Sequence, residues 1–391
     1  MEKKMKIRPS RPKPIVEVRS QRQKTVLLTP EEEDELTNYI IELQKIVLRL
    51  TINDVIIIAN QLAEKHNKKL IFRNNAIMAE RLWVFNLMKR HPKIILQIPN
   101  INSKSVGFNV AELDYFYKTL NGFYNVKKNP PDRIYTIDYI KIFLGESSTY
   151  IINQTKNKEN KDGIILKAIL CLNADGHYLP SMIIFPQKQQ PDLTYKESAW
   201  KICIPNSSLT NEFLQWLRRF IFLSGAKKEQ QVLLLFDGQL MYTKSIEIVN
   251  ITRNNGINMI CFPPCTQNRL QPIDDVFIND LSKAYEKVVE IWLQSNPGNK
   301  LTAENVVNLF DKILSKEAAT FAATEAFKRC GIYPLDMNLF TESDFIPVER
   351  KVQVDKETPP PTNTNHETVR SSKHYYDLYY NPRPGCSFWP D

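Results

Sequence analysis

Glycine, histidine and cysteine are all scarce in this chain: its 391 residues include 11 glycines, 5 histidines and 6 cysteines. So little glycine, together with 24 prolines, argues against a collagen-like or wholly disordered protein. The cysteines are scattered without the spacing of a disulfide framework, which favours a reducing compartment. Cys261 and Cys265 bracket Phe-Pro-Pro, but no second Cys/His pair stands at zinc spacing, so no zinc site is predicted.

Long apolar runs are missing as well. No stretch approaches the ~18 uninterrupted apolar residues that span a bilayer, and no membrane partner is predicted. The beginning, MEKKMKIRPSRPKP, is basic and broken by proline, unlike a secretory signal. Hydrophobic residues still make up 42% of the chain and charged residues 24%, enough to bury a core. The length indicates about two or three domains.

The positive charge is concentrated at the beginning of the chain. The net charge is +9, and residues 1–28 hold nine Lys or Arg against two Glu. A flexible basic arm of this kind binds phosphate backbones without reading sequence and serves as a nuclear import signal. A solubilising tail has the same composition, so the arm leaves both interpretations open.

Residues 29–97 carry a helical pattern. Thr29 is placed as an N-cap with Glu32 as its capping-box partner, and a second helix start follows at Thr51 with Asp54. A third helix is predicted from about residue 76 to Arg90, before Pro92. Three short helices, the last rich in cations, suit a helix-turn-helix module. A three-helix bundle with a core Trp83 and solvated cations explains the same pattern.

The rest of the chain divides into three parts. Residues 98–130 are predicted to be a helical linker, and 131–336 an α/β domain. Short apolar runs predict strands at 133–138, 163–172, 177–185, 231–237 and 257–262, with helices at 210–223, 245–254 and about 275–293. This order indicates a three-strand meander followed by parallel strand–helix–strand units. Residues 337–391, including TPPPTNTN, are predicted to be a mostly disordered tail.

Three aspartates stand at the ends or beginnings of these elements. Asp138 ends the first predicted strand, Asp237 ends a buried strand and Asp274 opens the long helix. In α/β sheets ligands gather beyond the carboxyl ends of strands, and carboxylate oxygens suit Mg²⁺ or Mn²⁺. Two such ions activate a hydroxyl and stabilise the leaving oxygen in phosphodiester cleavage. Aspartates at these positions also simply cap the next helix, which is the alternative.

Several motifs in order resemble one known family. They are RIYTIDY (133–139), DGIILKAILCLNADGHYLPSMIIF (162–185), LLLFDG (233–238), INMICFPPCTQNRLQPID (257–274) and FKRCGIYPLDMNLFTESDF (327–345). Upstream, LTPEEEDELTNYI and WVFNLMKRHPKI resemble a CENP-B-type helix-turn-helix domain. Together they resemble the pogo/jerky-like transposases, DDE superfamily endonucleases, over residues 19–347.

The resemblance implies a multidomain α and α/β protein, with a helix-turn-helix domain before an RNase H-like mixed sheet. Its catalytic and metal-binding triad would be Asp138, Asp237 and Asp274, holding Mg²⁺ or Mn²⁺ in an active enzyme. The partner would be double-stranded DNA in the nucleus, with a homo-oligomer left open. The DNA contacts that we predict in the helical domain are Arg81, Lys89, Arg90 and Lys93.

The sequence departs from the family pattern beside two of these aspartates. Tyr139, Ile140 and Lys141 follow the first aspartate, where the family has an acid or a small polar residue and then glycine. After Asp237 the family has two histidines, and here Gln239 and Tyr242 replace them. We therefore expect a transposase-derived DNA-binding protein with weakened or lost catalysis. An active Mg²⁺-dependent transposase and a protein-interaction scaffold are the alternatives.

Overall fold

A computed structural model describes the following residues: 28–46, 50–68, 77–96, 110–127, 130–145, 149–153, 163–185, 200–203, 209–237, 244–263, 266, 269–341 and 344. The basic arm, the loop after Asp237 and nearly all of the predicted tail lie outside them. None of the helices in the described ranges is long and apolar enough to cross a membrane.

Three helices form a compact unit at the start of the described chain: α1 (Pro30–Ile46), α2 (Ile52–Lys65) and α3 (Ile77–Arg90). Both predicted capping boxes are present. Thr29 Oγ1 accepts from Glu32 N at 3.3 Å while Glu32 Oε2 accepts from Thr29 N at 2.7 Å, and Thr51 and Asp54 make the same reciprocal pair. Trp83 is buried, as the bundle interpretation expects.

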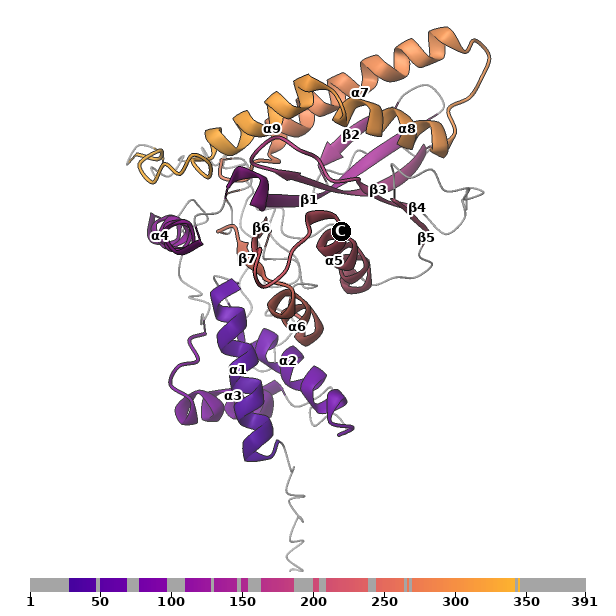
Figure 1. Ribbon diagram of the computed structural model, residues 1–391. Coiled ribbons are helices and arrows are strands. Elements are labelled where there is room, and N and C mark those ends of the chain that lie inside the picture. The colour runs from indigo at the N-terminus through magenta and orange to yellow at the C-terminus, as the bar shows by residue number, and fades with distance from the viewer. Residues whose placement is uncertain are drawn as a thin grey trace, which may run out of the picture.

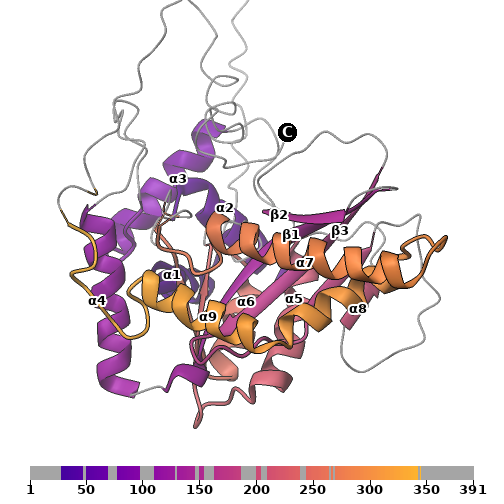
Figure 2. The same ribbon diagram turned by 90° about the horizontal axis from the view of Figure 1, so that it is seen from above.

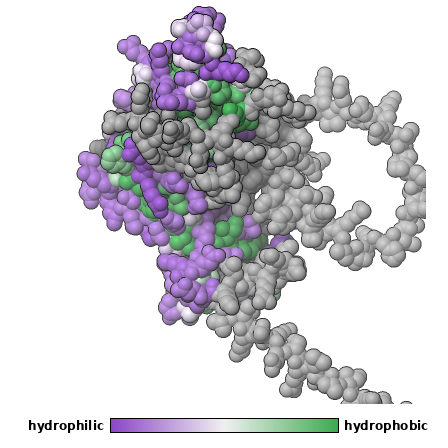
Figure 3. Space-filling view, turned by 90° about the vertical axis from the view of Figure 1, so that its right-hand side faces the viewer, coloured by the Kyte–Doolittle hydropathy of each residue, from purple (hydrophilic) through white to green (hydrophobic). Residues whose placement is uncertain are grey.

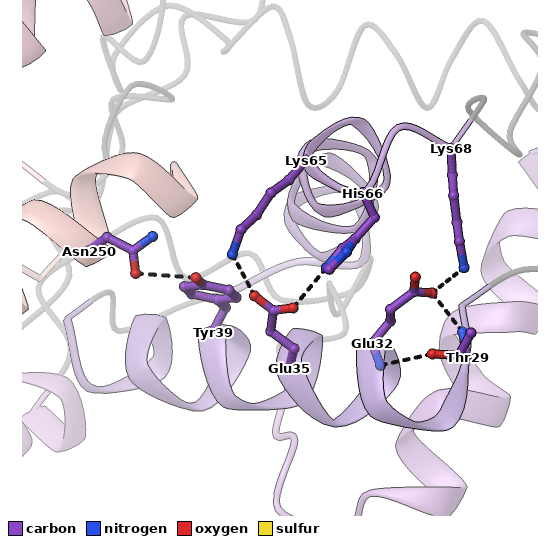
Figure 4. A network of polar contacts seen from close by, with 8 residues as sticks. All are labelled: Thr29, Glu32, Glu35, Tyr39, Lys65, His66, Lys68 and Asn250. Atoms are coloured by element: carbon purple, nitrogen blue, oxygen red, sulfur yellow. Dashed lines mark hydrogen bonds and ion pairs between the residues drawn. The ribbon is translucent and has the colours of Figure 1, made fainter.

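The acidic beginning of α1 binds the ends of the other two helices. Glu35 receives hydrogen bonds from Lys65 Nζ at 2.7 Å and lies 2.8 Å from His66 Nε2, and Glu32 pairs with Lys68 (Figure 4). Glu33 accepts both Nε and Nη2 of Arg90, at 2.6 and 2.8 Å. These contacts hold the three helices together at one end of the unit.

A mixed β-sheet follows the helical unit. It contains β1 (Ile134–Gly145), β2 (Thr149–Asn153), β3 (Gly163–Asn173), β4 (Met182–Phe185), β5 (Trp200–Cys203), β6 (Val232–Phe236) and β7 (Ile257–Cys261). The strand order is β5-β4-β3-β1-β6-β7, with β2 paired to β1. The β1–β3 and β3–β4 pairs are antiparallel, whereas β1–β6 and β6–β7 are parallel. The predicted meander and parallel units are confirmed.

Strand β1 is twice as long as predicted. The expected strand ended at Asp138, but β1 continues to Gly145 because residues 140–144 pair with β2 on one edge and with β3 on the other. Asp138 therefore lies in the middle of a strand instead of at its end. The short β2 and β5 were not predicted, since neither carries a long β-branched run.

The sheet separates two hydrophobic cores. Even-numbered β1 residues such as Ile140 and Ile142 belong to the core formed with α7 (Asp275–Ser295), α8 (Ala303–Leu314) and α9 (Glu317–Arg329). Odd-numbered residues such as Tyr135 and Tyr139 belong to the core formed with α5 (Leu209–Ser224), α6 (Ile246–Asn254) and the helical unit. Figures 1 and 2 show these two layers of helices on opposite faces of the sheet.

The predicted linker helix is part of the sheet domain. Helix α4 (Val110–Lys127) buries Phe116 and Tyr117 in the same core as α7, and the Tyr117 hydroxyl donates to Cys330 O at 2.7 Å. Tyr124 likewise donates to Ile332 O at 2.9 Å. Helix α4 is therefore part of the hydrophobic core of the sheet domain and does not act as a separate linker.

The helical unit also docks on the sheet domain, through α6. Asp54 and Lys244 form an ion pair of 2.9 Å that is almost completely buried. Gln61 donates to Lys244 O at 3.3 Å and accepts from Ile246 N at 2.9 Å. Its side-chain amide is therefore hydrogen-bonded to two backbone groups at the start of α6. Tyr39 donates to Asn250 at 3.2 Å further along the same helix (Figure 4).

We predict that Lys244→Met lowers the free energy of unfolding by about 3 kcal/mol, because it leaves the Asp54 carboxylate buried beside an apolar side chain. Glu42→Gln is the control, since it breaks an exposed pair with Arg253 at the same interface and is expected to cost less than about 1 kcal/mol. Urea denaturation of both variants measures the difference. Equal costs would show that the buried pair does not stabilise the docking.

Candidate acidic site on the mixed sheet

Asp138 and Asp237 lie on neighbouring parallel strands. The register pairs Thr136 of β1 with Leu235 of β6, so Asp138 and Asp237 stand two residues further along the same two strands. Asp237 directly follows Phe236, the last residue of β6, as predicted. Both carboxylates therefore come from one edge of the β1–β6 pair.

Burial and neighbouring charge act together on Asp138. Burial is the larger cause and the charge of Asp237 the next, and together they raise the pKa of the Asp138 carboxyl to about 8. A hydrogen bond of 2.8 Å from the Tyr139 backbone N–H to Asp138 Oδ1 acts in the opposite direction. The charge of Asp275 raises this pKa further. We call Asp138, Asp237 and Asp275 the acidic cluster, because the charges of the last two act on the first.

Asp274 is the N-cap of α7, and its carboxylate is already bound twice. Its Oδ1 accepts the Phe277 backbone N–H at 2.8 Å and Nη2 of Arg329 at 3.0 Å. The side chain is 5% exposed, and burial raises the pKa of Asp274 while these two partners oppose the rise. The predicted opening of the long helix by Asp274 is confirmed. The helix-capping alternative, left open by the sequence, describes what this carboxylate does here.

The sequence favoured Asp274 over its neighbour, but it is Asp275 whose charge acts on Asp138. The two aspartates are adjacent, and the sequence does not show that the one beside the N-cap acts on Asp138. The N-cap has an extended backbone, whereas the next residue begins the helix, so their side chains leave α7 in different directions. The presence of Arg329 opposite Asp274, 55 positions later in the chain, could not be seen in the sequence.

The donor chemistry of the acidic cluster suits a hard divalent cation. Its groups are carboxylate oxygens, with neither histidine nor cysteine, which is the ligand type of Mg²⁺ and Mn²⁺. Repulsion from Asp237 and Asp275 adds to the effect of burial on the pKa of Asp138, and a cation would relieve this repulsion. Over the described ranges, however, no three acidic, histidine or cysteine side chains stand close enough to hold an ion as they are.

Tyr139 and Lys141 do not face the acidic cluster. Tyr139 is buried in the core on the α5 side of the sheet, opposite to the face of Ile140 and Asp138. Lys141 is two residues further on the same face as Tyr139, directly across from Lys167 on β3. Strand alternation thus directs both side chains to the face opposite to that of Asp138. Gln239 and Tyr242 lie outside the described residues.

The four predicted DNA-contacting cations belong to the end of the helical unit. Lys89 and Lys93 are exposed, and Arg81 is half-buried on α3. Arg90 is held by Glu33 through two hydrogen bonds, as described above, which leaves less of its guanidinium for a phosphate. The exposed Leu82 and Phe85 lie on the same helix. Helix α3 therefore presents a mixed basic and apolar surface.

Residues 165–327 match the family model of the DDE superfamily endonuclease. This part of the chain contains β3 to α9 and thus most of the mixed sheet. A curated relative, the MFS-type transporter clz9 of Cochliobolus lunatus, is 23% identical over 221 residues, which are 53% of this chain. The chain spans about a quarter of that relative's length, 24%.

Among solved structures, the chain is similar to the Mos1 mariner paired-end complex with Mn, at 13% identity and a TM-score of 0.33, over 85% of this chain and 80% of that one. It is also similar to the catalytic domain of Mos1 mariner transposase, at 12% identity and a TM-score of 0.32, over 58% and 92% of the two chains. TM-scores of this size do not establish a common site.

We predict that Asp138→Asn flattens the pH dependence of stability. Asp138 has a pKa of about 8 in the folded protein and about 3.9 when unfolded. Between these values unfolding releases a proton, so the contribution of this group is fully present below the lower value and is lost as pH rises to the upper one. The variant's melting temperature should therefore exceed the parent's increasingly as pH rises through this window.

Asp280→Asn on the exposed side of α7 is the control, since Asp280 pairs only with the exposed Lys283 among the residues described. Differential scanning fluorimetry across the pH range compares the three proteins. Parallel pH profiles of Asp138→Asn and its parent would show that Asp138 ionises normally.

Proposed function

We propose that this chain is a DNA-binding protein derived from a pogo/jerky-like DDE transposase, with weakened or lost metal-dependent catalysis. The observation that carries the proposal is the double engagement of Asp274 by the α7 N-terminus and by Arg329. An aspartate that neutralises an arginine and caps a helix is a poorer ligand for a cation. Asp138 and Asp237 are left with Asp275 as their acidic neighbour.

The helical unit supports the DNA-binding half of the proposal. Its capping boxes and buried Trp83 make it a stable three-helix module, and α3 presents Lys89 on its exposed side. In a helix-turn-helix protein such a helix enters the major groove while cations contact the phosphates. Its docking on α6 would give DNA held there a defined position relative to the sheet. The basic arm adds phosphate contacts and nuclear targeting.

An active Mg²⁺- or Mn²⁺-dependent endonuclease is the second candidate, and the acidic cluster is the observation in its favour. Asp138, Asp237 and Asp275 would hold the ion. A bound divalent ion would supply activation of a hydroxyl and stabilisation of the leaving oxygen. The protein's own contribution would be to hold these carboxylates together in a partly buried place on the sheet. Asp138 would lose its proton when the ion binds.

A plasmid-nicking assay distinguishes the two candidates. We expect the parent chain, in Mg²⁺ or Mn²⁺ with plasmid carrying candidate terminal repeats, to nick no faster than Asp237→Ala. Arg329→Gln should gain nicking, because it releases Asp274. Lys328→Gln is the control, since it removes a neighbouring cation that pairs with the exposed Glu325. Robust nicking by the parent, abolished by Asp237→Ala, would establish the active enzyme instead.

DNA binding by the full chain should depend steeply on salt, with separate contributions from the arm and the helical unit. Deleting residues 1–24 removes nine cations. Each lost phosphate contact should lower the slope of log affinity against log salt by about 0.9. We expect the deletion to flatten the slope and to leave any sequence preference unchanged. An arm of equal length with Gln in place of Lys and Arg tests the effect of charge alone. If the slope of log affinity against log salt stays unchanged in both variants, the arm does not contact DNA.

A further inference from the structure

The turn that leads into β6 is held rigidly by its surroundings. Lys227 and Gln230 exchange two backbone hydrogen bonds, of 3.2 and 3.0 Å. The guanidinium of Arg133 donates to Ser224 O at 2.7 Å and also to Gln230 O, so it ties the turn to the end of α5. Gly256, with φ of +65°, lies so close that an added Cβ would meet Lys227 O at 2.3 Å. Turn 227–230 is thus braced from three directions.

This braced turn presents two consecutive lysines to solvent. Lys227 and Lys228 are both exposed. Because their backbone is already fixed, a ligand bound by their ammonium groups does not have to order the turn. Rigid presentation of adjacent cations favours an anion with repeated charges.

An arginine and an exposed aromatic ring stand at the end of α5, beside the turn in the chain. The Arg219 guanidinium lies 5.1 Å from the centroid of the Phe222 ring. Phe222 is 73% exposed. Figure 3 shows one side of the molecule, where the described surface is mostly hydrophilic and hydrophobic residues form patches. The ring orients the guanidinium and offers its remaining surface to a ligand. The next cation, Arg218, is engaged by Glu247 at 2.8 Å.

We propose that Arg219, Phe222, Lys227 and Lys228 form a second DNA-binding surface, the β6-turn surface, which holds the phosphate backbone of the DNA that this protein binds. The cations would contact the phosphates of the duplex, and the ring would pack against the sugars beside them. The proposal rests on the DNA binding proposed above. The surface lies at the opposite end of β6 from Asp237, about 17 Å away along a five-residue strand. It is therefore separate from the acidic cluster.

The test is the affinity of the full chain for a labelled mixed-sequence DNA duplex across a salt series. Lys227→Ala with Lys228→Ala should weaken binding at least tenfold and lower the salt slope by about 2, as expected for two lost phosphate contacts. Lys312→Ala with Lys316→Ala is the matched control, because these lysines are also exposed, one in the last turn of α8 and the other at the N-cap of α9. Phe222→Ala should weaken binding with little change in slope, since the ring carries no charge. Melting temperatures show whether each variant is folded.

Three outcomes would overturn the proposal. If both lysine pairs behave alike while the parent binds DNA, the β6-turn surface is not a DNA contact and the proposed function stands. If the parent does not bind DNA at any salt concentration, the proposed function fails and this surface with it. If the Lys227/Lys228 variant loses binding to polyglutamate but keeps its affinity for DNA, the surface recognises acidic protein instead.

Discussion

The pairing of β1 along both of its edges is the constraint on which the rest of the structure depends. The strand is antiparallel to β3, parallel to β6 and antiparallel to β2 beyond the end of β6. Its backbone is therefore satisfied along nearly its whole length, and each face meets a separate hydrophobic core. Asp138 is partly buried between these cores. The energetic cost of charging Asp138 follows directly from this pairing.

The same pairing brings the acidic cluster and the helical unit into one connected arrangement. Strand β6 lies beside β1, and Asp237 directly follows its last residue. Helix α6 is the next element along the chain. The start of α6 is where Asp54 and Gln61 of the helical unit bind. The start of α6 is thus held by the module that we propose to contact DNA.

Local chemistry explains which elements could be predicted. The capping boxes at Thr29 and Thr51 depend on residues only three positions apart. The α/β order follows from apolar periodicity. The length of β1 could not be predicted, because its second half is stabilised by pairing with β2, and the role of α4 depends on a core formed by residues about 200 positions away. Long-range partners decide both.

The candidate site divides in the same way. By itself, the sequence determined that Asp237 follows the end of β6 and that Asp274 precedes α7, because local composition marks these two boundaries. Its motifs also resembled the DDE superfamily endonucleases, whose family model matches residues 165–327. Only the tertiary structure decided which carboxylates interact. Asp274 is claimed by Arg329 from α9, Asp275 acts on Asp138, and strand alternation turns Tyr139 toward the opposite core. Charge interactions act through space, and the distances that set their strength exist only once the chain has folded.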